Sequence, residues 1–493
     1  MINITSILSG KESVTIEAKL ASGGLPNSIW ESYSSFANTF GGVILLGVEE
    51  NKETHALVAR GVEDPHQLIT NIWNVLNNSQ KISNNILLDN HIYAAEYQST
   101  QLVVMEVPRA SRREKPVYIG PDPFRGTFRR NHEGDYHCSR EEILAMMRDQ
   151  AIESADSKIL ENMELSDLNS ESIYRYRTMF NNKKPGHVWT NLRDEEFLLK
   201  IGAAGKGEDK HLHPTLAGLV FFGDFMNIVN ELPNYFLDYR ERLSTDTRWS
   251  DRVNSGDGNW SGNIFDFYFK IIDRLTSDVK RPFKLDKNLL RVDDTPVHAG
   301  LRESLANALI HADYYGRCGI VIDKKFREVS ISNPGLFRIG IDEAIAGGIS
   351  DARNSRLFNM FSLIEVGERS GSGLCDIFHT WNENGYKRPS ITETLDPDRI
   401  TITLQIEIDS NGSNHERNDS KSESNERNHE SNLSENEMHV FEVLCRNNGL
   451  SAGQVAAQTG LSVSTVNRIY KSLKAKSYIM RNGKTRGKWV ILK

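Results

Sequence analysis

The stretch PVHAGLRESLANALIHADY, residues Pro296 to Tyr314, decides the central fold of this chain. Its apolar residues recur at helical spacing and predict one helix with one buried face. That face holds Leu301, Leu305, Ala308 and Leu309. Glu303, Asn307 and His311 are spaced four residues apart, so we expect them to line one side of the helix. There, an amide oxygen can bind an octahedral Mg²⁺, and a carboxylate one turn earlier can activate a water.

Two short motifs lie further along the chain. The first is the turn sequence Ser332-Asn333-Pro334-Gly335. The second is the glycine-rich run GERSGSGL at residues 367–374. Glycines let backbone N–H groups approach phosphate oxygens without obstruction by a Cβ atom. A glycine-rich run of this kind is therefore compatible with bound phosphate.

The motif Glu303-x-x-x-Asn307-Ala308 resembles the N-box of the GHKL ATPase fold, and residues 214–406 resemble the RecG-helicase-like C-terminal family, a bacterial branch of that fold. The resemblance implies an α/β sandwich that binds ATP and Mg²⁺. Asn307 would bind the metal, and Glu303 would position or deprotonate the attacking water. Asn333 and Gly335 stand where the family carries an Asp-x-Gly turn for adenine, and Gly371 and Gly373 belong to the lid over the phosphates. Asn333 replaces the aspartate, so base selection should be weaker. A structural core in which these motifs bind nothing stays open as an alternative.

Length and composition are those of a multidomain globular protein. The length of 493 residues predicts roughly three domains. A content of 38% hydrophobic and 25% charged residues is typical of a soluble globular protein. The four cysteines form no Cys-x-x-Cys pair, which argues against a disulfide framework or zinc site. No signal peptide or long apolar run is visible, so we expect a cytoplasmic protein without a membrane partner. Proteins of this architecture are often homo-oligomers, but no interface signature is visible.

The first 150 residues carry a second set of motifs. They are ESVTIEAK from Glu12, FANTFGG from Phe36, and a hydrophobic strand that ends in Gly47-Val48-Glu49-Glu50. This combination closely resembles the Schlafen AlbA-type domain, which implies binding of nucleic acid and, in some members, metal-dependent cleavage of RNA. By position, the nuclease carboxylates would be Glu12, Glu17 and Glu49, with Glu50 as the alternate for the third.

Two functions stay open for this domain. Three carboxylates converging on Mg²⁺ or Mn²⁺ would polarise a phosphate and activate water, while Lys19 neutralises developing charge. Alternatively the domain binds nucleic acid without cleaving it, and Glu17 and Lys19 form only a surface ion pair on one face of a strand.

Arginines crowd a segment of the same domain that has few acidic residues. They are Arg109, Arg112, Arg113, Arg129 and Arg130, with aromatic residues between them. Arginine forks suit phosphates, and aromatic rings can stack on bases. We predict phosphate contact here; a solvated loop with its aromatics in the core is the alternative.

Residues 151–290 show no chemistry of their own and predict a connecting region. Residues 154–180 and 194–200 have helical patterns, and residues 214–223 resemble a helix running into a buried strand. We expect the GHKL-like domain at 291–408. Residues 409–435 are almost without apolar side chains and predict a disordered linker.

Residues 436–493 resemble a winged helix-turn-helix. The segment from Ser451 to Lys493 holds nine Lys or Arg and no Asp or Glu, which indicates a polyanion partner. The residues expected on the groove and on phosphate are Ser464, Thr465, Asn467, Arg468 and Lys471 in the recognition helix and Arg481, Lys484, Arg486 and Lys488 in the wing. A winged helix used for protein contact is the alternative.

The sequence therefore predicts an α/β (α+β) multidomain, nucleic-acid-binding protein with an ATP-binding core. DNA is the preferred partner, with RNA or tRNA as the alternative. Transcriptional regulation and sensing of foreign nucleic acid both fit. A metal-dependent nuclease built on Glu12, Glu17 and Glu49 is the competing prediction.

Overall fold

The computed structural model of the chain divides into two compact units, Met1–Ser413 and Asn414–Lys493. Several segments fall outside the described residues, among them the expected linker at 409–435. The described residues are 2–51, 53–243, 248–277, 279, 295–348, 351–367, 373–406, 440, 443–444, 451–459, 461–475, 479–481 and 489–491.

The first part of the chain forms a small sheet with strand order β1-β2-β6-β5. Its strands are β1 (Ile16–Lys19), β2 (Gly42–Leu46), β5 (Ile92–Tyr97) and β6 (Thr100–Val107). Strands β1 and β2 are parallel, and the other neighbours are antiparallel. The helices are α1 (Ile4–Leu8), α2 (Ile29–Asn38), α3 (Pro65–Leu76), α4 (Pro123–Gly126) and α5 (Arg140–Gln150). Two hairpins complete it: β3 (Val48–Glu50) with β4 (Leu57–Ala59), and β7 (Phe128–Asn131) with β8 (Gly134–His137).

The connecting region is mainly helical. It contains α6 (Ser170–Lys183), α7 (Asp194–Ile201), the hairpin β9 (Ala204–Lys206) and β10 (Leu212–Pro214), α8 (Leu216–Phe222) and α9 (Phe225–Glu231). The long helix expected from residue 154 begins only at Ser170, after two 3₁₀ turns. The strand expected near residue 223 is absent from this described segment, since α8 is helical and every residue in it is buried.

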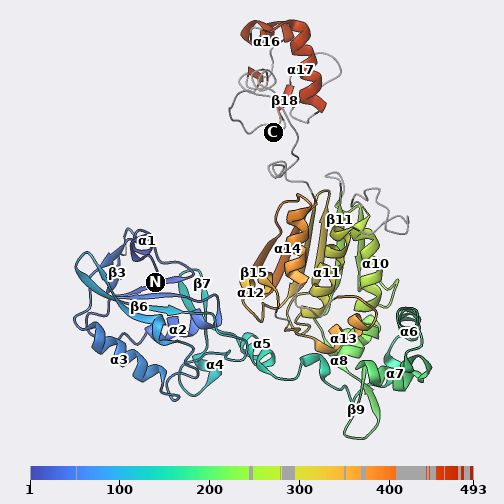
Figure 1. Ribbon diagram of the computed structural model, residues 1–493, viewed down its shortest axis with the longest axis horizontal. Coiled ribbons are helices and arrows are strands. Elements are labelled where there is room, and N and C mark those ends of the chain that lie inside the picture. The colour runs from blue at the N-terminus through green and yellow to red at the C-terminus, as the bar shows by residue number, and fades with distance from the viewer. Residues whose placement is uncertain are drawn as a thin grey trace, which may run out of the picture. The chain divides into compact units, whose positions relative to one another are not determined.

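A six-stranded sheet forms the centre of the first unit, with order β12-β11-β13-β14-β16-β15. Its strands are β11 (Leu237–Arg242), β12 (Asp251–Asn254), β13 (Ile320–Lys325), β14 (Glu328–Pro334), β15 (Ser390–Thr394) and β16 (Arg399–Gln405). Helices α10 (Ile264–Thr276), α11 (Pro296–His311) and α14 (Gly373–Glu383) run over one face of this sheet (Figure 1). Helices α12 (Ile341–Ala346) and α13 (Ser355–Leu363) lie in the connection from β14 to α14. Because β11 and β12 belong to this sheet, the domain boundary expected at residue 291 runs through it.

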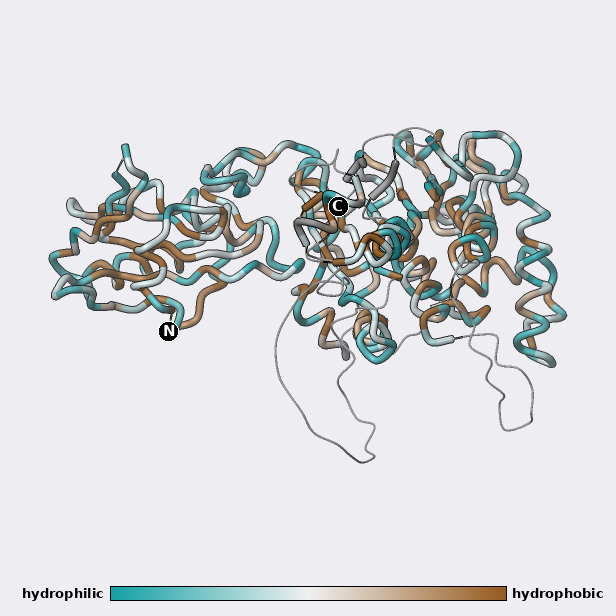
Figure 2. The backbone as a smooth tube through the Cα atoms, turned by 90° about the horizontal axis from the view of Figure 1, so that it is seen from above, coloured by the Kyte–Doolittle hydropathy of each residue, from teal (hydrophilic) through white to brown (hydrophobic). Residues whose placement is uncertain are grey.

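Helix α11 is the helix predicted from the opening stretch. Thr295 caps it by accepting a hydrogen bond from the His298 N–H, and Pro296 occupies the first turn, where no N–H donor is needed. The predicted apolar face is confirmed, since Leu301, Leu305, Ala308 and Leu309 are all buried. Hydrophobic segments, brown in Figure 2, follow the buried strands and helices.

The second unit contains α16 (Ala452–Thr459), α17 (Val463–Ala475) and the antiparallel pair β17 (Ile479–Arg481) and β18 (Trp489–Ile491). Helix α17 coincides with the predicted recognition helix, and β17 with β18 is a strand pair of the kind expected in the wing, whose residues 482–488 lie outside the described residues. Among the described residues of the whole chain, no helix is both long and apolar enough to cross a membrane.

Candidate functional site

A pocket of about 130 Å³ lies between helix α11, the ends of the central strands and the start of α14. Glu303, Asn307 and His311 all line it, so the predicted polar side of the helix faces this space. Asn333 from β14 and Gly373 from α14 line it too. Residues from three separate sequence motifs therefore meet at one cavity.

Gly373 lies directly against the polar residues of α11. A Cβ atom at this position would collide with the Glu303 carboxylate and would come within 3.1 Å of the Asn307 Nδ2 atom. The glycine therefore allows backbone to pass next to the carboxylate and amide, as the lid resemblance requires. Gly371 lies outside the described residues.

The pocket also has apolar lining residues and a second amide. Ile391, Ile400 and Ile402, from the neighbouring strands β15 and β16, form an apolar part of its wall. Asn333 is 6% exposed, and its Nδ2 atom donates to the Pro334 carbonyl at 3.2 Å. Its amide oxygen is left to accept a hydrogen bond from a ligand. Gly335 does not line this pocket; it has a φ of +97° and packs against the Arg353 guanidinium behind it.

Arg338 is a cation in the pocket wall that the sequence did not single out. Its side chain is 8% exposed, and its Nε atom forms no hydrogen bond with any described residue. Its other nitrogens donate to the Ala352 carbonyl at 2.9 Å and lie 3.6 Å from Asp351. Burial lowers the pKa of Arg338, while Asp351 and Asp149 raise it. A buried guanidinium with an unused donor suits a ligand with acceptor atoms.

His311 faces this same wall in its neutral form. Burial, then the nearby charges of Arg353 and Arg338, lower the pKa of its imidazole to about 4. At neutral pH the ring adds no charge to the pocket, and the two arginines supply the positive field.

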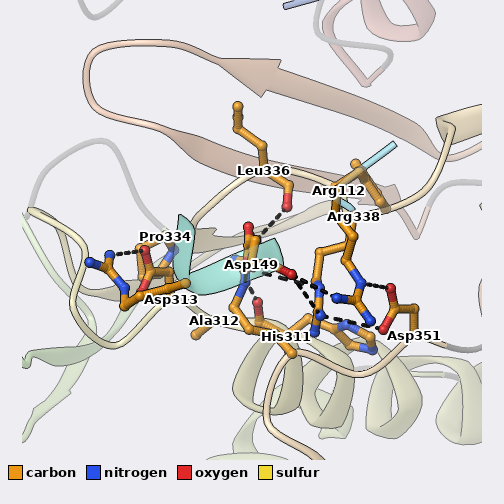
Figure 3. Close-up of polar contacts among 12 residues, drawn as sticks. Arg112, Asp149, His311, Ala312, Asp313, Pro334, Leu336, Arg338 and Asp351 are labelled. Atoms are coloured by element: carbon orange, nitrogen blue, oxygen red, sulfur yellow. Dashed lines mark hydrogen bonds and ion pairs between the residues drawn. The ribbon is translucent and has the colours of Figure 1, made fainter. Parts of the chain in front are cut away.

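Asp149, near the end of α5, inserts into this group of arginines (Figure 3). Its carboxylate accepts two hydrogen bonds from Arg353, at 3.0 and 2.9 Å. Arg353 also donates to the carbonyls of Leu336 and His311, at 2.8 and 3.1 Å. The first domain is thereby tied to the pocket wall. No local pattern marks this pair, because its members lie 204 positions apart in the chain.

Four of the five arginines predicted to contact phosphate form intramolecular pairs. Arg109 binds Glu393, at 2.5 and 3.2 Å, and the Phe337 carbonyl at 3.0 Å. Arg112 binds Asp351 and also donates to the Asp149 carbonyl at 2.7 Å. Both contacts end on residues that line the pocket or flank its wall.

Arg129 and Arg130 are buried, contrary to the expectation that they bind nucleic acid. Arg129 pairs with Glu142 and with Asp398, the latter at 2.9 Å. Arg130 is 1% exposed and pairs with Glu17 and Asp135. These four guanidinium groups are already used in this structure, so they are not an open basic surface. Of the five arginines predicted, Arg113 is exposed.

Of the predicted nuclease carboxylates, Glu12 and Glu17 lie near one another, and Glu17 carries counterions. Glu17 is buried between Lys19, at 2.6 Å, and Arg130, at 2.7 Å. The pKa of Glu12 is raised to about 6, first by burial and then by the charges of Glu17 and Glu50, while a hydrogen bond from the Ala18 N–H opposes the shift. Glu50 is therefore the member of the acidic pair that lies near Glu12.

Glu49 points away from this group and pairs with Arg60 at 2.9 Å. Within the described residues, no set of three or more His, Cys, Asp or Glu side chains is arranged to hold a metal ion. In this arrangement the carboxylates do not fit a bound metal, because cations already neutralise Glu17.

Helix α17 has the surface that a recognition helix requires. Val466, Ile469, Tyr470 and Leu473 are buried on one side. The other side exposes Ser464, Asn467, Arg468 and Lys471, with Thr465 half-buried. The Ser462 hydroxyl caps the helix by accepting from the Thr465 N–H at 3.2 Å. The wing residues Lys484, Arg486 and Lys488 lie outside the described residues, as does the side chain of Arg481.

Comparisons with known protein families match four segments of the chain. Residues 12–139 match "Schlafen, AlbA_2", and residues 325–404 match "Putative ATP-dependent DNA helicase recG C-terminal". Residues 433–480 match a winged helix-turn-helix DNA-binding family. Residues 144–238 match a domain of unknown function, DUF8451, which covers much of the connecting region. The comparison with curated proteins found no match.

The solved structures to which the chain is similar include the following two. The crystal structure of the DIP2311 protein from Corynebacterium diphtheriae covers 99% of this chain and 96% of its own, with 15% identity and a TM-score of 0.40. The NMR structure of the N-terminal domain of a RecG-related protein from Nitrosomonas europaea covers 28% of this chain and 95% of its own, with 20% identity and a TM-score of 0.22.

The winged helix-turn-helix and the AlbA- and RecG-related segments indicate DNA binding. The chain combines a Schlafen AlbA_2 domain, a domain of the RecG C-terminal type and a winged helix-turn-helix.

Proposed function

We propose that this protein is a DNA-binding regulator, in transcription or in sensing foreign nucleic acid, whose RecG-like core binds a magnesium nucleotide. The observation that carries the nucleotide is the meeting of Glu303, Asn307, Asn333 and Gly373 at one pocket. Because these residues come from three motifs far apart in the sequence, a chance polar patch is a poor explanation.

The pocket has the chemistry for such a ligand. The apolar wall of Ile391, Ile400 and Ile402 suits a flat base, and the Asn333 amide suits the edge of that base. The Asn307 amide would supply an oxygen to Mg²⁺, and the glycine at 373 lets the backbone at the start of α14 lie against Glu303 and Asn307. Bound Mg²⁺ would neutralise phosphate charge. Glu303 would accept a proton from water if the nucleotide is hydrolysed.

The contacts of the pocket wall support a coupling between nucleotide and domain arrangement. Arg338 and Asp351 line the pocket, and they also contact Asp149 and Arg112 of the first domain. A ligand that attracts Arg338 competes with these carboxylates. Nucleotide would thereby bias how tightly the arginine-rich segment is held, and so how much of it can meet DNA.

Thermal unfolding with and without Mg-ATP tests the nucleotide site. Wild-type protein should be stabilised by about 2.7 kcal/mol when the ligand is at 100 times its Kd. Asn307→Ala should lose the stabilisation, whereas Asn382→Ala, at an exposed asparagine in α14, should keep it. Equal shifts for wild type and Asn307→Ala, or no shift with any purine nucleotide, would remove the nucleotide from the proposal.

Metal-dependent cleavage stays a prediction for the first domain. Incubation with tRNA and with plasmid, in Mn²⁺ or in EDTA, decides it. Cleavage that is lost in Glu17→Gln, with folding intact, would establish the nuclease. Intact substrate under every condition would exclude it.

A further inference from the structure

Four arginines surround a single tryptophan at one edge of the central sheet. The guanidinium carbons of Arg240, Arg242, Arg248 and Arg252 lie 5.5, 5.1, 4.9 and 5.3 Å from the centre of the Trp249 ring. These five residues, here called the Trp249 cluster, come from β11, β12 and the connection between them. Their proximity could not be predicted from the sequence alone, since Arg240 and Arg252 meet only when β11 and β12 pair.

One buried carboxylate holds part of the cluster in place. Arg240 and Arg252 are direct cross-strand partners, and like charges in that position repel. Asp238, whose side chain is 0% exposed, lies 2.6 Å from Arg240 and 2.9 Å from Arg252. The carboxylate therefore offsets the repulsion and orients both guanidinium groups.

The cluster keeps an excess of positive charge at the surface. Arg242 is exposed and pairs with Asp323 at 3.1 Å. Arg248 is also exposed, and no ion pair joins it to another described residue. Among the residues that the structure describes, four guanidinium groups thus face two carboxylates, Asp238 and Asp323, which leaves an excess of about two positive charges around a half-buried aromatic ring.

A polar sheet face extends from this cluster. Asp238, Arg240 and Arg242 alternate along β11, so they share one face of the sheet. Across the register, Asp323, Ser330, Thr403 and Ser390 continue that face. The opposite face carries the buried residues that meet the helices, for example Tyr239, Ile322 and Ile331. The helix layer therefore leaves the hydroxyl-lined face uncovered by α10, α11 and α14.

We propose that the Trp249 cluster binds single-stranded nucleic acid. An unpaired base would stack on the Trp249 ring or on a guanidinium plane above it, and Arg242 and Arg248 would bind the flanking phosphates. Aromatic stacking combined with arginine charge is the general basis of sequence-tolerant single-strand binding. A duplex offers no unpaired base, and an acidic peptide would use the charges but not the ring. The site is separate from the nucleotide pocket and from the winged helix.

Fluorescence anisotropy with a labelled oligothymidylate at low salt tests the proposal on the full-length protein. Trp249→Leu should weaken binding about tenfold, the scale of one lost base stack, and Trp249→Phe should retain most of it. The pair Arg242→Gln and Arg248→Gln should flatten the dependence of log K on log salt by about 1.4, at roughly 0.7 for each phosphate contact. Arg193→Gln, at an exposed arginine elsewhere in the same unit, should change neither quantity.

Photo-cross-linking to an iodouridine-substituted oligonucleotide gives a readout that does not depend on a variant folding. The cross-link should map to the peptide that contains Trp249, and it should persist in Arg468→Ala with Lys471→Ala and in Asn307→Ala. Wild-type affinity and salt slope in Trp249→Leu, or cross-links that map only to the winged helix, would overturn the proposal. The proposal would also be overturned if polyglutamate of equal charge competes with the oligonucleotide and binds the Trp249→Leu variant as tightly as it binds wild type.

Discussion

The pair between Asp149 and Arg353 should contribute more to the stability of the first unit than any exposed ion pair, and Asp149→Asn tests this. The side chains of Arg353 and Asp149 are 7% and 27% exposed. The substitution removes the negative charge and leaves a buried guanidinium with only carbonyl partners. Breaking a buried pair on one side costs about 3–5 kcal/mol. Because Asp149 is partly exposed and Arg353 keeps its hydrogen bonds to carbonyl groups, we expect a loss of unfolding free energy at the lower end of this range, about 3 kcal/mol.

Differential scanning calorimetry measures the effect. The first unit spans Met1–Ser413; at about 2.1 cal/mol/K of unfolding entropy per residue, about 3 kcal/mol corresponds to a decrease in Tm of roughly 3–4 °C. Asp194→Asn is the matched control, because Asp194 also pairs with an arginine, Arg177, but its side chain is 68% exposed. That control should cost less than about 1 kcal/mol.

A double-mutant cycle with Arg353→Gln separates the pair from other effects of the substitution. The two changes should be less than additive, with a coupling of about 2 kcal/mol. Additive losses, or a Tm of Asp149→Asn equal to that of Asp194→Asn, would refute the claim that a buried ion pair ties the first domain to the pocket wall.

Three further predictions concern charge. Burial, then the charge of Arg109, lowers the pKa of Lys115 to about 7. Above pH 7 the unfolded chain therefore binds more protons at Lys115 than the folded chain does. Between pH 7 and 9, the free energy of unfolding of wild type, measured by urea titration, should rise by about 2 kcal/mol relative to that of Lys115→Met. Parallel pH profiles of the two proteins would contradict this. Burial and the charges of Glu17 and Glu50 raise the pKa of Glu12 to about 6, so its ionisation disfavours the folded state above that pH. Glu12→Gln should therefore be more stable than wild type at pH 7 by about 1–2 kcal/mol, with the difference vanishing below pH 4.5; a less stable variant would show that the carboxylate has a favourable partner. Arg468→Ala with Lys471→Ala should reduce the salt slope of duplex DNA binding by about 1.8, and an unchanged slope would exclude phosphate contacts from these two residues.

Local patterns in the sequence were sufficient for the elements with strong periodicity. Helix α11 could be predicted because its apolar residues recur every three to four positions, and that spacing also places Glu303, Asn307 and His311 on one side. The recognition helix α17 followed from the same rule, since Val466, Ile469 and Leu473 mark its buried side. The prediction for segment 214–223 was wrong in part, because a continuous apolar run does not distinguish a fully buried helix from a strand.

Ion-pair partners, in contrast, were decided only by the tertiary structure. The composition around Arg109, Arg112, Arg129 and Arg130 predicted a basic surface, but Glu393, Asp351, Asp398 and Glu17 neutralise these residues from elsewhere in the chain. The sequence by itself determined which domains are present, where the nucleotide motifs lie and which face of each periodic helix is buried. Which charges remain open to a ligand depended on the fold, because a Coulomb interaction is set by distance in space and by burial, and neither is encoded in local spacing.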